Sequence, residues 1–196
     1  SERQQEPALA LIGADGVWSS VRHQLFPEAQ PQFTGSIAWR RTVDASQLPR
    51  GFMTQRVQLW MGTNAHLVAY PMSGGKRINM VAIVSGKWNR PGWSEPGDVV
   101  EIANHFADPH WPIAARMMIG AVDSWRKWAL FAMRDGGVWN KGPIALLGDA
   151  SHAMLPFAAQ GAGMAIEDAA VIDKCLDASR GNPTAAFAQY ASLRTS

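Results

Sequence analysis

The chain has 196 residues, of which 47% are hydrophobic and 17% charged, so it can bury a sizeable core in one large or two small domains. A formal net charge of +2 without a basic run gives no sign of binding to nucleic acid or to a membrane surface. One cysteine and no apolar run of about 18–20 residues exclude an internal disulfide and a transmembrane helix, and fit a reducing cytoplasm.

The first predicted strand is the short apolar run Ala8–Ile12, which is followed at once by Gly13-Ala14-Asp15-Gly16. A helix is expected next, with Ser19 or Ser20 as its N-cap and residues 21–26 as its body. By itself, the Gly-x-Asp-Gly turn is also compatible with an ordinary connection between a strand and a helix.

The middle of the chain has a different pattern. Alternating apolar and polar residues predict strands at 33–43, 56–61, 65–72, 77–85 and 125–133. Residues 88–97 are expected to form a loop. A helix capped by Asp98 should follow, and then a short helix from Pro112 through Ile119. Because the first four strands have no helix between them, an antiparallel or mixed sheet is predicted here.

Two polar side chains of this predicted sheet are candidates for chemistry. His66 and Tyr70 are four residues apart on one strand, which places both on the same face. An imidazole and a phenol there could together bind and deprotonate a phenol-like substrate. The alternative is that both are hydrogen-bonded within the sheet or face solvent.

Towards the C-terminus, the apolar run Ile144–Leu147 predicts a buried parallel strand. Gly148 and Asp149 follow at its carboxyl end, where open α/β sheets bind ligands. A loop with Pro156 leads to a helix that begins at about Gly161. The expected buried residues of this helix are Ala165, Ala169, Ile172 and Leu176.

The start of that helix consists of small residues, including Gly161, Ala162 and Gly163. Its first N–H groups have no partner within the helix and lie at the positive end of the helix dipole. An electron-rich flat or phosphorylated ligand could therefore approach the backbone closely. A further helix is predicted after Asn182, the expected N-cap, and Pro183.

The order Gly-Asp-Ala-x-His, Pro, Gln-Gly-x-Gly and Glu-Asp-Ala within residues 148–169 resembles the second flavin-binding motif of the FAD-dependent aromatic hydroxylases. This class includes the p-hydroxybenzoate and salicylate hydroxylases. Residues 13–22, GADGVWSSVR, look like the middle fingerprint of the same family. Residues 65–71, AHLVAYP, resemble a strand that lines the aromatic pocket in salicylate- and hydroxynicotinate-type members.

The resemblance implies roles for particular residues. Asp149 would bind the ribityl chain of FAD, and the N–H groups at Ala162 and Gly163 would face the pyrimidine part of the flavin ring. Asp15 and Arg22 become candidates for a place near the FAD pyrophosphate and the path of the nicotinamide. The expected cofactor-binding set is completed by Gly148, Pro156 and Gly161. His66 and Tyr70 would orient the substrate or assist its deprotonation.

The fold implied is α/β with α+β character. Residues 1–30 and 136–196 would form part of a Rossmann-like FAD-binding domain, and residues 31–135 an inserted, mixed or antiparallel substrate-binding sheet. The implied enzyme is a monooxygenase that uses FAD, NADH or NADPH, and dioxygen. It would hydroxylate a small phenol- or benzoate-like aromatic through a flavin hydroperoxide. A flavin epoxidase or reductase of the same fold is an alternative, and a homodimer is compatible with this interpretation.

Two departures qualify the resemblance. No G-x-G-x-x-G turn for the ADP part of FAD is present, so the chain is expected to be the middle and later part of a longer enzyme. The second alternative is thus a non-catalytic fragment that is unable to hold FAD alone. Ala159 stands where many members have glycine. The five histidines show no metal-ligand spacing with Cys175, so no metal site is expected.

Overall fold

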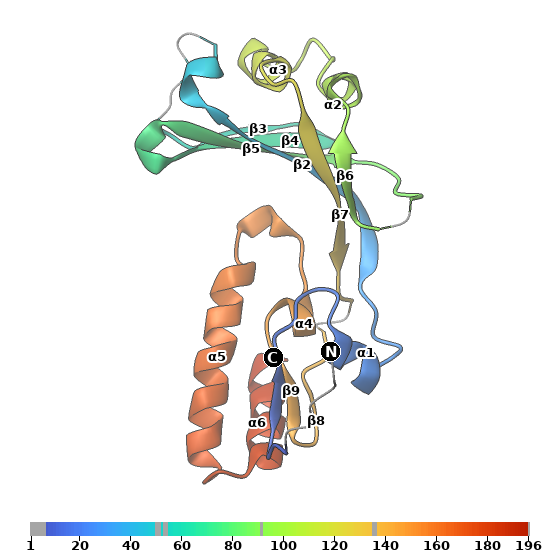
Figure 1. Cartoon of the computed structure of the whole chain (residues 1–196), viewed down its shortest axis with the longest axis vertical. Helices are drawn as coiled ribbons and strands as arrows, with labels where there is room; N and C mark the ends of the chain where they lie inside the picture. Colours follow the sequence, from blue (N-terminus) through green and yellow to red (C-terminus); the bar gives the residue numbers. More distant parts are fainter. Residues whose placement is uncertain (1–6, 50–51, 53–54, 91, 135–136, 196) are drawn as a thin grey trace. The chain divides into compact units, whose positions relative to one another are not determined.

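The computed structural model describes residues 7–49, 52, 55–90, 92–134 and 137–195 (Figure 1). The chain divides into two compact units. Ser1–Gln32 and Phe131–Ser196 form one of them, which we call the terminal unit because it contains both ends of the chain. Phe33–Leu130 form the other, which we call the sheet unit.

The terminal unit contains a small mixed sheet in the order β1-β9-β8. Its strands are β1 (Leu11–Gly13), β9 (Ile144–Leu146) and β8 (Asn140–Lys141). β1 is parallel to β9, and β8 is antiparallel to β9. Gly13 is the register partner of Leu146, so the two turns that follow these strands leave the sheet at the same edge. Two motifs that are far apart in the sequence are therefore neighbours.

The helices of the terminal unit are α1 (Ser20–Leu25), α4 (Asp149–His152), α5 (Gly161–Ala178) and α6 (Pro183–Arg194), with a short 3-10 helix, η3 (Pro156–Ala158). Both predicted caps are confirmed. Ser19 Oγ accepts a hydrogen bond from Arg22 N at 2.9 Å, and Asn182 Oδ1 accepts one from Ala185 N at 3.2 Å. Helix α4 lies within the stretch for which only a loop was expected.

The core of this unit forms where α5 and α6 pack together with β9. It contains Trp139, Ala145, Ile172, Cys175, Ala186, Phe187 and Tyr190. The predicted buried stripe of α5 is wrong at Ala169, which is exposed. The residues that α5 buries are instead Asp168, Ile172 and Cys175, at spacings of four and three, and they form the inward face of the helix. One buried carboxylate therefore lies within an otherwise apolar face.

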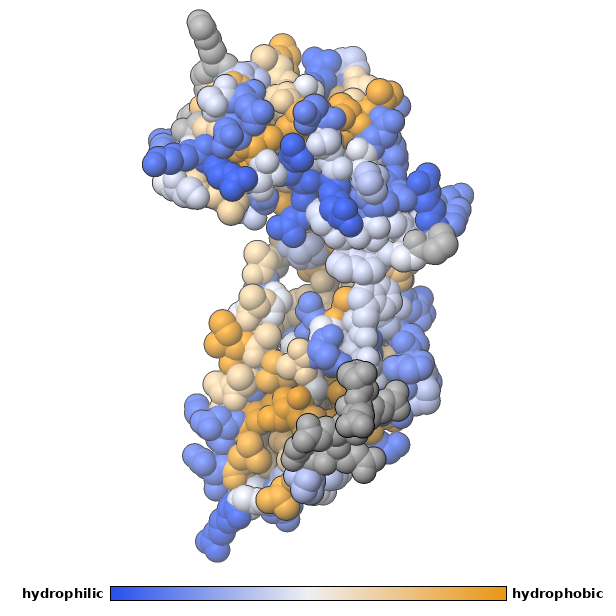
Figure 2. All heavy atoms as spheres, viewed as in Figure 1, coloured by the Kyte–Doolittle hydropathy of each residue, from blue (hydrophilic) through white to orange (hydrophobic). Residues whose placement is uncertain are grey.

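Several large apolar side chains of the terminal unit are exposed. Leu11 and Ile12 of β1 are 47% and 42% exposed, and Ile166 of α5 is 72% exposed. Figure 2 shows apolar residues at the surface of the part of the molecule that contains α5. The run at Ala8–Ile12 thus gives a strand without full burial, since among the described residues β1 is the edge strand and pairs only with β9.

The sheet unit contains six strands in the order β3-β4-β5-β2-β7-β6. They are β2 (Gln32–Asp44), β3 (Gln58–Met61), β4 (Ala65–Met72), β5 (Arg77–Ser85), β6 (Ser94–Gly97) and β7 (Trp125–Ala132). The pairs β2–β5, β3–β4, β4–β5 and β6–β7 are all antiparallel. The predicted antiparallel or mixed sheet is confirmed, and the fold is mixed α/β.

Two helices, α2 (Val99–His105) and α3 (Ile113–Gly120), cover one face of this sheet (Figure 1). Short 3-10 helices, η1 (Ala45–Gln47) and η2 (Ser73–Gly75), lie in the connections. Asp98 Oδ1 accepts hydrogen bonds from the backbone N–H groups of Val100 and Glu101, as expected for the N-cap of α2. The main core lies between the sheet and these helices, with Trp39, Leu67, Met80 and Ile102 among its fully buried residues.

The prediction of a loop over residues 88–97 is wrong for its last four residues, which form β6. Position 91 lies outside the described residues. β6 pairs with β7, and Pro96 is the partner of Arg126 in the register. A proline cannot donate to a ladder, but β6 is the last strand of the sheet and has one free edge within the part of the chain that the structure describes. The glycines and prolines of this segment are typical of loops, so the sequence pattern did not predict this edge strand.

Candidate functional site

A sharp turn at Gly148 joins β9 to α4. Gly148 has φ 60° and ψ −138°, a conformation that strongly favours glycine. A Cβ atom at this position would also lie 3.0 Å from the Cβ of Ala165. The turn therefore depends on glycine for its backbone angles and for its close approach to α5.

Asp149 follows this turn and is exposed. Its carboxylate makes no hydrogen bond within the part of the chain that the structure describes. A Cβ atom built on Gly161 would lie 3.9 Å from Asp149 Oδ1, so this carboxylate lies beside the start of α5. An exposed acceptor group is thus placed next to a helix N-terminus.

The start of α5 is open to a ligand. Gln160 is the N-cap residue, but no side chain caps the helix there. A Cβ atom on Gly163 would meet nothing within 4 Å, and Ala162 is exposed. Backbone N–H groups of an uncapped first turn present donors and a partial positive charge. The donor set here, together with the free acceptor of Asp149, fits the polar ribityl chain and the electron-rich ring of a flavin.

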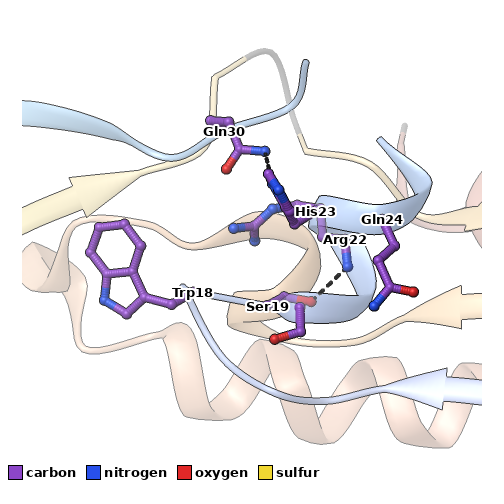
Figure 3. A pocket seen from close by; sticks show the side chains of 7 residues that line it. Trp18, Ser19, Arg22, His23, Gln24 and Gln30 are labelled. Carbon is purple, nitrogen blue, oxygen red and sulfur yellow. Dashed lines mark hydrogen bonds between the residues drawn. The ribbon is translucent and has the colours of Figure 1, made fainter. Parts of the chain in front are cut away.

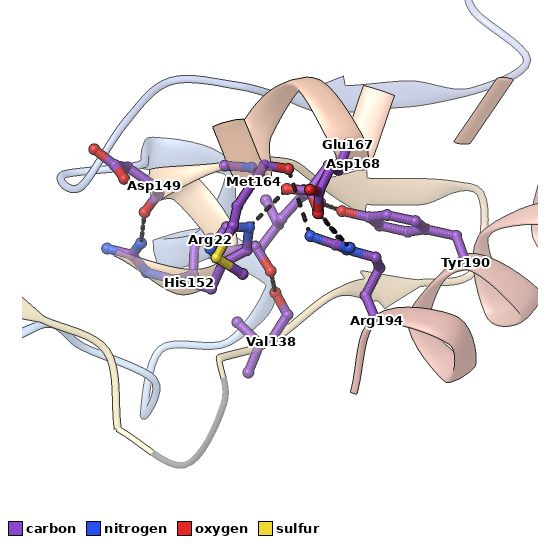
Figure 4. A network of polar contacts seen from close by, with 12 residues as sticks. Arg22, Val138, Asp149, His152, Met164, Glu167, Asp168, Tyr190 and Arg194 are labelled. Carbon is purple, nitrogen blue, oxygen red and sulfur yellow. Dashed lines mark hydrogen bonds and ion pairs between the residues drawn. The ribbon is translucent and has the colours of Figure 1, made fainter. Parts of the chain in front are cut away.

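A buried carboxylate lies behind this turn (Figure 4). Asp168 of α5 is 0% exposed, and its Oδ2 accepts hydrogen bonds from Gly148 N at 2.9 Å and from His152 Nε2 at 2.6 Å. Its Oδ1 accepts one from Arg194 Nε of α6 at 2.7 Å. We call Gly148, His152, Asp168 and Arg194 the Asp168 network. The ring of His152 also packs on Trp139.

The two candidate residues of the first motif bind the backbone of the chain itself. Asp15 Oδ2 accepts hydrogen bonds from Ser20 N at 2.7 Å and from Val21 N at 3.2 Å. Partial burial acts to raise the pKa of Asp15, but hydrogen bonds from Ser19 and these N–H groups outweigh it, so the pKa is lowered. The Asp15 carboxylate therefore stabilises the first turn of α1.

Arg22 is 1% exposed, and its guanidinium donates to three carbonyl oxygens. Nη1 donates to Ala150 at 2.8 Å and to Asp149 at 3.5 Å, and Nη2 donates to Val17. Burial lowers the pKa of Arg22, and the nearby Asp15 opposes this shift. In the geometry observed, Arg22 joins the two motifs to each other.

A shallow pocket of ≈ 360 Å³ lies beside α1 (Figure 3). Its lining is mostly polar and consists of Trp18, Ser19, Ser20, Arg22, His23, Gln24 and Gln30. His23 and Gln30 are hydrogen-bonded to each other at 3.1 Å, and the Arg22 guanidinium binds carbonyl groups. The Nε of Arg22 is buried and has no hydrogen-bond partner among the described residues. Because the other guanidinium nitrogens bind carbonyl groups of the chain, the pocket does not by itself indicate a ligand.

In the sheet unit, His66 and Tyr70 lie on β4 on the face opposite α2 and α3, which we call the helix-free face. Residues 65, 67 and 69 of β4 are buried in the core under the helices, whereas 66, 68 and 70 are half-buried. His66 pairs with Ile83 of β5, and Tyr70 pairs with Asn79. Paired residues share a face, so the helix-free face continues across β5. Burial lowers the pKa of His66, which favours its neutral form.

Asn79 is a polar residue of this face that the sequence analysis missed. It is 5% exposed, and its Oδ1 accepts a hydrogen bond from Thr42 Oγ1 at 3.0 Å. Its Nδ2 is buried and has no partner among the described residues. An unpaired buried donor costs about 1–3 kcal/mol, so such groups often mark a site for a ligand or water.

The structure therefore brings together Asp15, Arg22, Gly148, Asp149 and Gly161 in the terminal unit, where Pro156, Ala162 and Gly163 also lie. His66 and Tyr70 share one strand of the sheet unit. Asp168, missed as a site residue, could have been suspected because it is an acidic residue four positions before Ile172 on the inward face of a helix.

Two absences concern the described residues. They contain no group of three or more His, Cys, Asp or Glu side chains that could hold a metal ion. They also contain no helix with the length and apolar character needed to cross a membrane.

Comparison with known proteins identifies the family. A family model described as FAD binding domain matches residues 4–185, and the chain belongs to this family. Its relatives define the group more closely, as FAD-binding aromatic hydroxylases. The resemblance inferred from the two motifs is thereby confirmed.

Three relatives illustrate the relationship. The chain is 36% identical over 190 residues to 3-amino-4-hydroxybenzoate 2-monooxygenase of Streptomyces platensis. The aligned residues make up 96% of this chain and 47% of that protein. It is 35% identical over 184 residues to 3-hydroxybenzoate 6-hydroxylase of Klebsiella oxytoca, and this alignment covers 94% of the chain and 46% of the relative. A salicylate hydroxylase solved as a substrate complex superposes with a TM-score of 0.83 at 30% identity. The superposition covers 96% of this chain and 51% of the salicylate hydroxylase. The chain spans about half the length of these proteins.

Proposed function

We propose that the intact protein is an FAD-dependent monooxygenase that hydroxylates a small phenol- or benzoate-like aromatic, with NADH or NADPH as co-substrate. One observation is the main support: the carboxylate of Asp149, which makes no hydrogen bond to the described residues, lies beside the uncapped, side-chain-poor N-terminus of α5. The names of the relatives, which are hydroxylases of hydroxybenzoates and of salicylate, support the aromatic substrate.

Bound FAD would supply the redox chemistry that activates dioxygen, while the chain supplies position and charge. Asp149 would accept hydrogen bonds from the hydroxyl groups of the ribityl chain. The N–H groups of Ala162 and Gly163 would stabilise negative charge on the ring. Gly148 and Gly161 leave room for this approach, and Pro156 begins the short helix η3 that leads to α5.

Asp15 and Arg22 contribute indirectly in this proposal. Asp15 fixes the first turn of α1, and Arg22 holds the carbonyl groups of Asp149 and Ala150. Both contacts keep the turn that contains Asp149 in place next to the first motif. A loss of either side chain should therefore weaken flavin binding through a displaced turn.

The helix-free face of the sheet unit is proposed to contact the aromatic substrate. His66 in its neutral form can accept a proton from a phenolic hydroxyl, and Tyr70 can donate or accept a hydrogen bond. His66 and Tyr70 lie four residues apart on the same face of β4, with Val68 between them, so they could hold one ring between them. The unpaired donor of Asn79, across from Tyr70, supports a polar ligand on this face.

The test of cofactor binding is the visible absorption of the purified chain mixed with FAD, recorded before and after gel filtration. Retained flavin bands are expected, and Asp149→Ala should abolish them. Asp173→Ala is the matched control, because Asp173 is an exposed carboxylate on the same helix, α5. Equal retention of flavin by Asp149→Ala and the control would contradict the proposed site.

A colourless chain would favour the second candidate, a folded fragment that cannot hold FAD alone. The observation behind this candidate is that the relatives are about twice as long as the chain. The same comparison of variants is then made in the intact protein. There, consumption of NADH or NADPH should depend on an added hydroxybenzoate, and mass spectrometry should show a product with one more oxygen atom. A lasting requirement for a long isoprenoid substrate would instead indicate an epoxidase or reductase.

A further inference from the structure

We propose that Asp168 is a positioning residue of the flavin site, which fixes the direction of Asp149 from inside the terminal unit. The inference rests on the proposed function, because it assigns Asp168 a task in the binding of FAD. It concerns a residue that does not reach the surface: Asp168 is 0% exposed and cannot contact the cofactor itself.

Three hydrogen-bond donors converge on the Asp168 carboxylate. Its two oxygens accept hydrogen bonds from Gly148 N, His152 Nε2 and Arg194 Nε, at 2.9, 2.6 and 2.7 Å. These donors come from the turn before α4, from the end of α4, and from α6. A carboxylate accepts several hydrogen bonds and donates none, so an amide or an apolar side chain cannot replace it in this role.

Both backbone polar groups of Gly148 form hydrogen bonds. Its N–H donates to Asp168, and its carbonyl oxygen accepts hydrogen bonds from Ser151 N at 2.8 Å and from His152 N at 2.9 Å. The residue has the φ of 60° described above, which glycine adopts without steric cost. Since the next residue in the chain is Asp149, these bonds determine where its side chain points.

Asp168 lies on α5, two helical turns after Gly161. The N-terminus of this same helix is the other half of the proposed flavin site. The hydrogen bond from Gly148 to Asp168 therefore joins the turn that contains Asp149 directly to the helix whose N–H groups face the ring. The distance between the two halves of the site depends on it.

A role in stability alone does not explain the choice of residue. A buried ion pair contributes little net stability compared with well-packed apolar side chains, because both charges lose their hydration. A geometrically defined set of hydrogen bonds is what a carboxylate adds. Groups that orient a binding residue from behind typically change affinity by about 10- to 100-fold when they are removed, as is documented for metal ligands.

The experiment compares Asp168→Asn with Glu167→Gln in the FAD-binding form of the protein. Glu167 is the neighbouring acidic residue and contacts the same Arg194 at 3.2 Å, but its side chain is 64% exposed. The dissociation constant for FAD is measured from the quenching of flavin fluorescence, and the unfolding midpoint is measured in parallel. The circular dichroism of the bound flavin and the NMR shift of the Gly148 amide report the geometry directly.

Asp168→Asn is expected to weaken FAD binding by about 10-fold or more, to alter the flavin dichroism and to shift the Gly148 amide upfield. Glu167→Gln should leave all three unchanged, since exposed ion pairs contribute little. If Asp168→Asn does not fold, Asp168→Glu replaces it. This variant keeps the charge but moves the carboxylate by one methylene group, and the same result is expected.

Two outcomes overturn the inference. One is wild-type FAD affinity and dichroism in a folded Asp168 variant, and the other is an equal loss in Glu167→Gln. Both leave the proposed function intact, because the wild-type protein still binds FAD. If the wild-type protein does not bind FAD at all, the proposed function fails, and Asp168 then has no flavin site to position.

Discussion

The guanidinium of Arg22 donates a hydrogen bond to the carbonyl oxygen of Ala150 at 2.8 Å. This contact joins α1, which begins within the first motif, to α4, which belongs to the second motif; Arg22 and Ala150 are 128 residues apart. Arg22 also binds the carbonyl of Val17, within its own motif. One buried side chain thus connects the two sequence motifs that define the family.

Arg22→Met is therefore expected to lower the free energy of unfolding by about 3 kcal/mol, because it leaves buried carbonyl groups without donors. Urea denaturation measures this loss. Arg134→Met serves as the control, since Arg134 is an exposed arginine of the same unit. A loss in Arg22→Met no larger than in the control would show that the carbonyl groups find other partners.

A second buried contact joins α6 to the small sheet. The phenol of Tyr190 donates to the carbonyl oxygen of Leu146 at 3.0 Å, and both residues are fully buried. Tyr190→Phe should destabilise the chain by about 1–3 kcal/mol, because the carbonyl group stays buried and loses its partner. Tyr70→Phe, on a half-buried position of β4, should change the free energy of unfolding much less. Similar losses in the two variants would contradict the importance of this bond.

Features that depend on neighbouring residues were predicted well from the sequence. The strands predicted at 65–72 and 77–85 have the bounds of β4 and β5, because alternation and a glycine-rich turn specify a hairpin locally. The caps at Ser19, Asp98 and Asn182 were found for the same reason: each is a short-range hydrogen bond to the next turn of the chain.

The Asp168 network could not be predicted in this way. Gly148 and Asp168 are 20 residues apart, and Asp168 and Arg194 are 26 apart, so their contacts depend on how α5 and α6 pack. The helical pattern also favoured Ala169 over Asp168 as a buried position, because a charged residue is rarely placed inside. The resemblance of residues 148–169 to a known motif located the site but did not reveal which residue supports it.

The missed strand β6 leads to a prediction about Gly97. A Cβ atom at this position would lie 2.3 Å from Cζ3 of Trp39, whose ring is fully buried in the core. Gly97→Ala should therefore cost about 1–3 kcal/mol of stability, since the ring cannot move without disturbing its neighbours. Gly120→Ala, at the end of α3, meets nothing within 4 Å and should be neutral or slightly stabilising. Thermal unfolding of both variants would show whether β6 packs this closely against Trp39.

Ala159 is a position at which the chain can be stabilised. It has φ 52° and ψ 28° in the left-handed region, which a residue with a Cβ atom adopts at a cost. Ala159→Gly should raise the free energy of unfolding by about 0.5–1 kcal/mol, despite the greater freedom of glycine in the unfolded chain. Gly163→Ala provides a comparison in the regular first turn of α5. A decrease in stability in Ala159→Gly would mean that the lost entropy outweighs the relieved strain.

His66 leads to a prediction about pH. Burial lowers the pKa of His66 below its ordinary value of 6.5, because the charged imidazolium loses hydration. If neutral His66 accepts the proton of the substrate, kcat/KM of the intact enzyme should stay constant as the pH falls through 6.5 and decrease only below it. The same shift means that the unfolded chain binds the proton first, so stability should also decrease as the pH falls below about 6.5.

The measurement is the pH profile of kcat/KM for the wild type, His66→Gln and His105→Gln. Burial also lowers the pKa of His105, but that residue lies on α2, on the other face of the sheet, which makes it the matched control. His66→Gln should lower kcat/KM and remove the decrease at acidic pH, whereas His105→Gln should retain it. An acidic limb centred above 6.5, or one that persists in His66→Gln, would assign the proton transfer to another group.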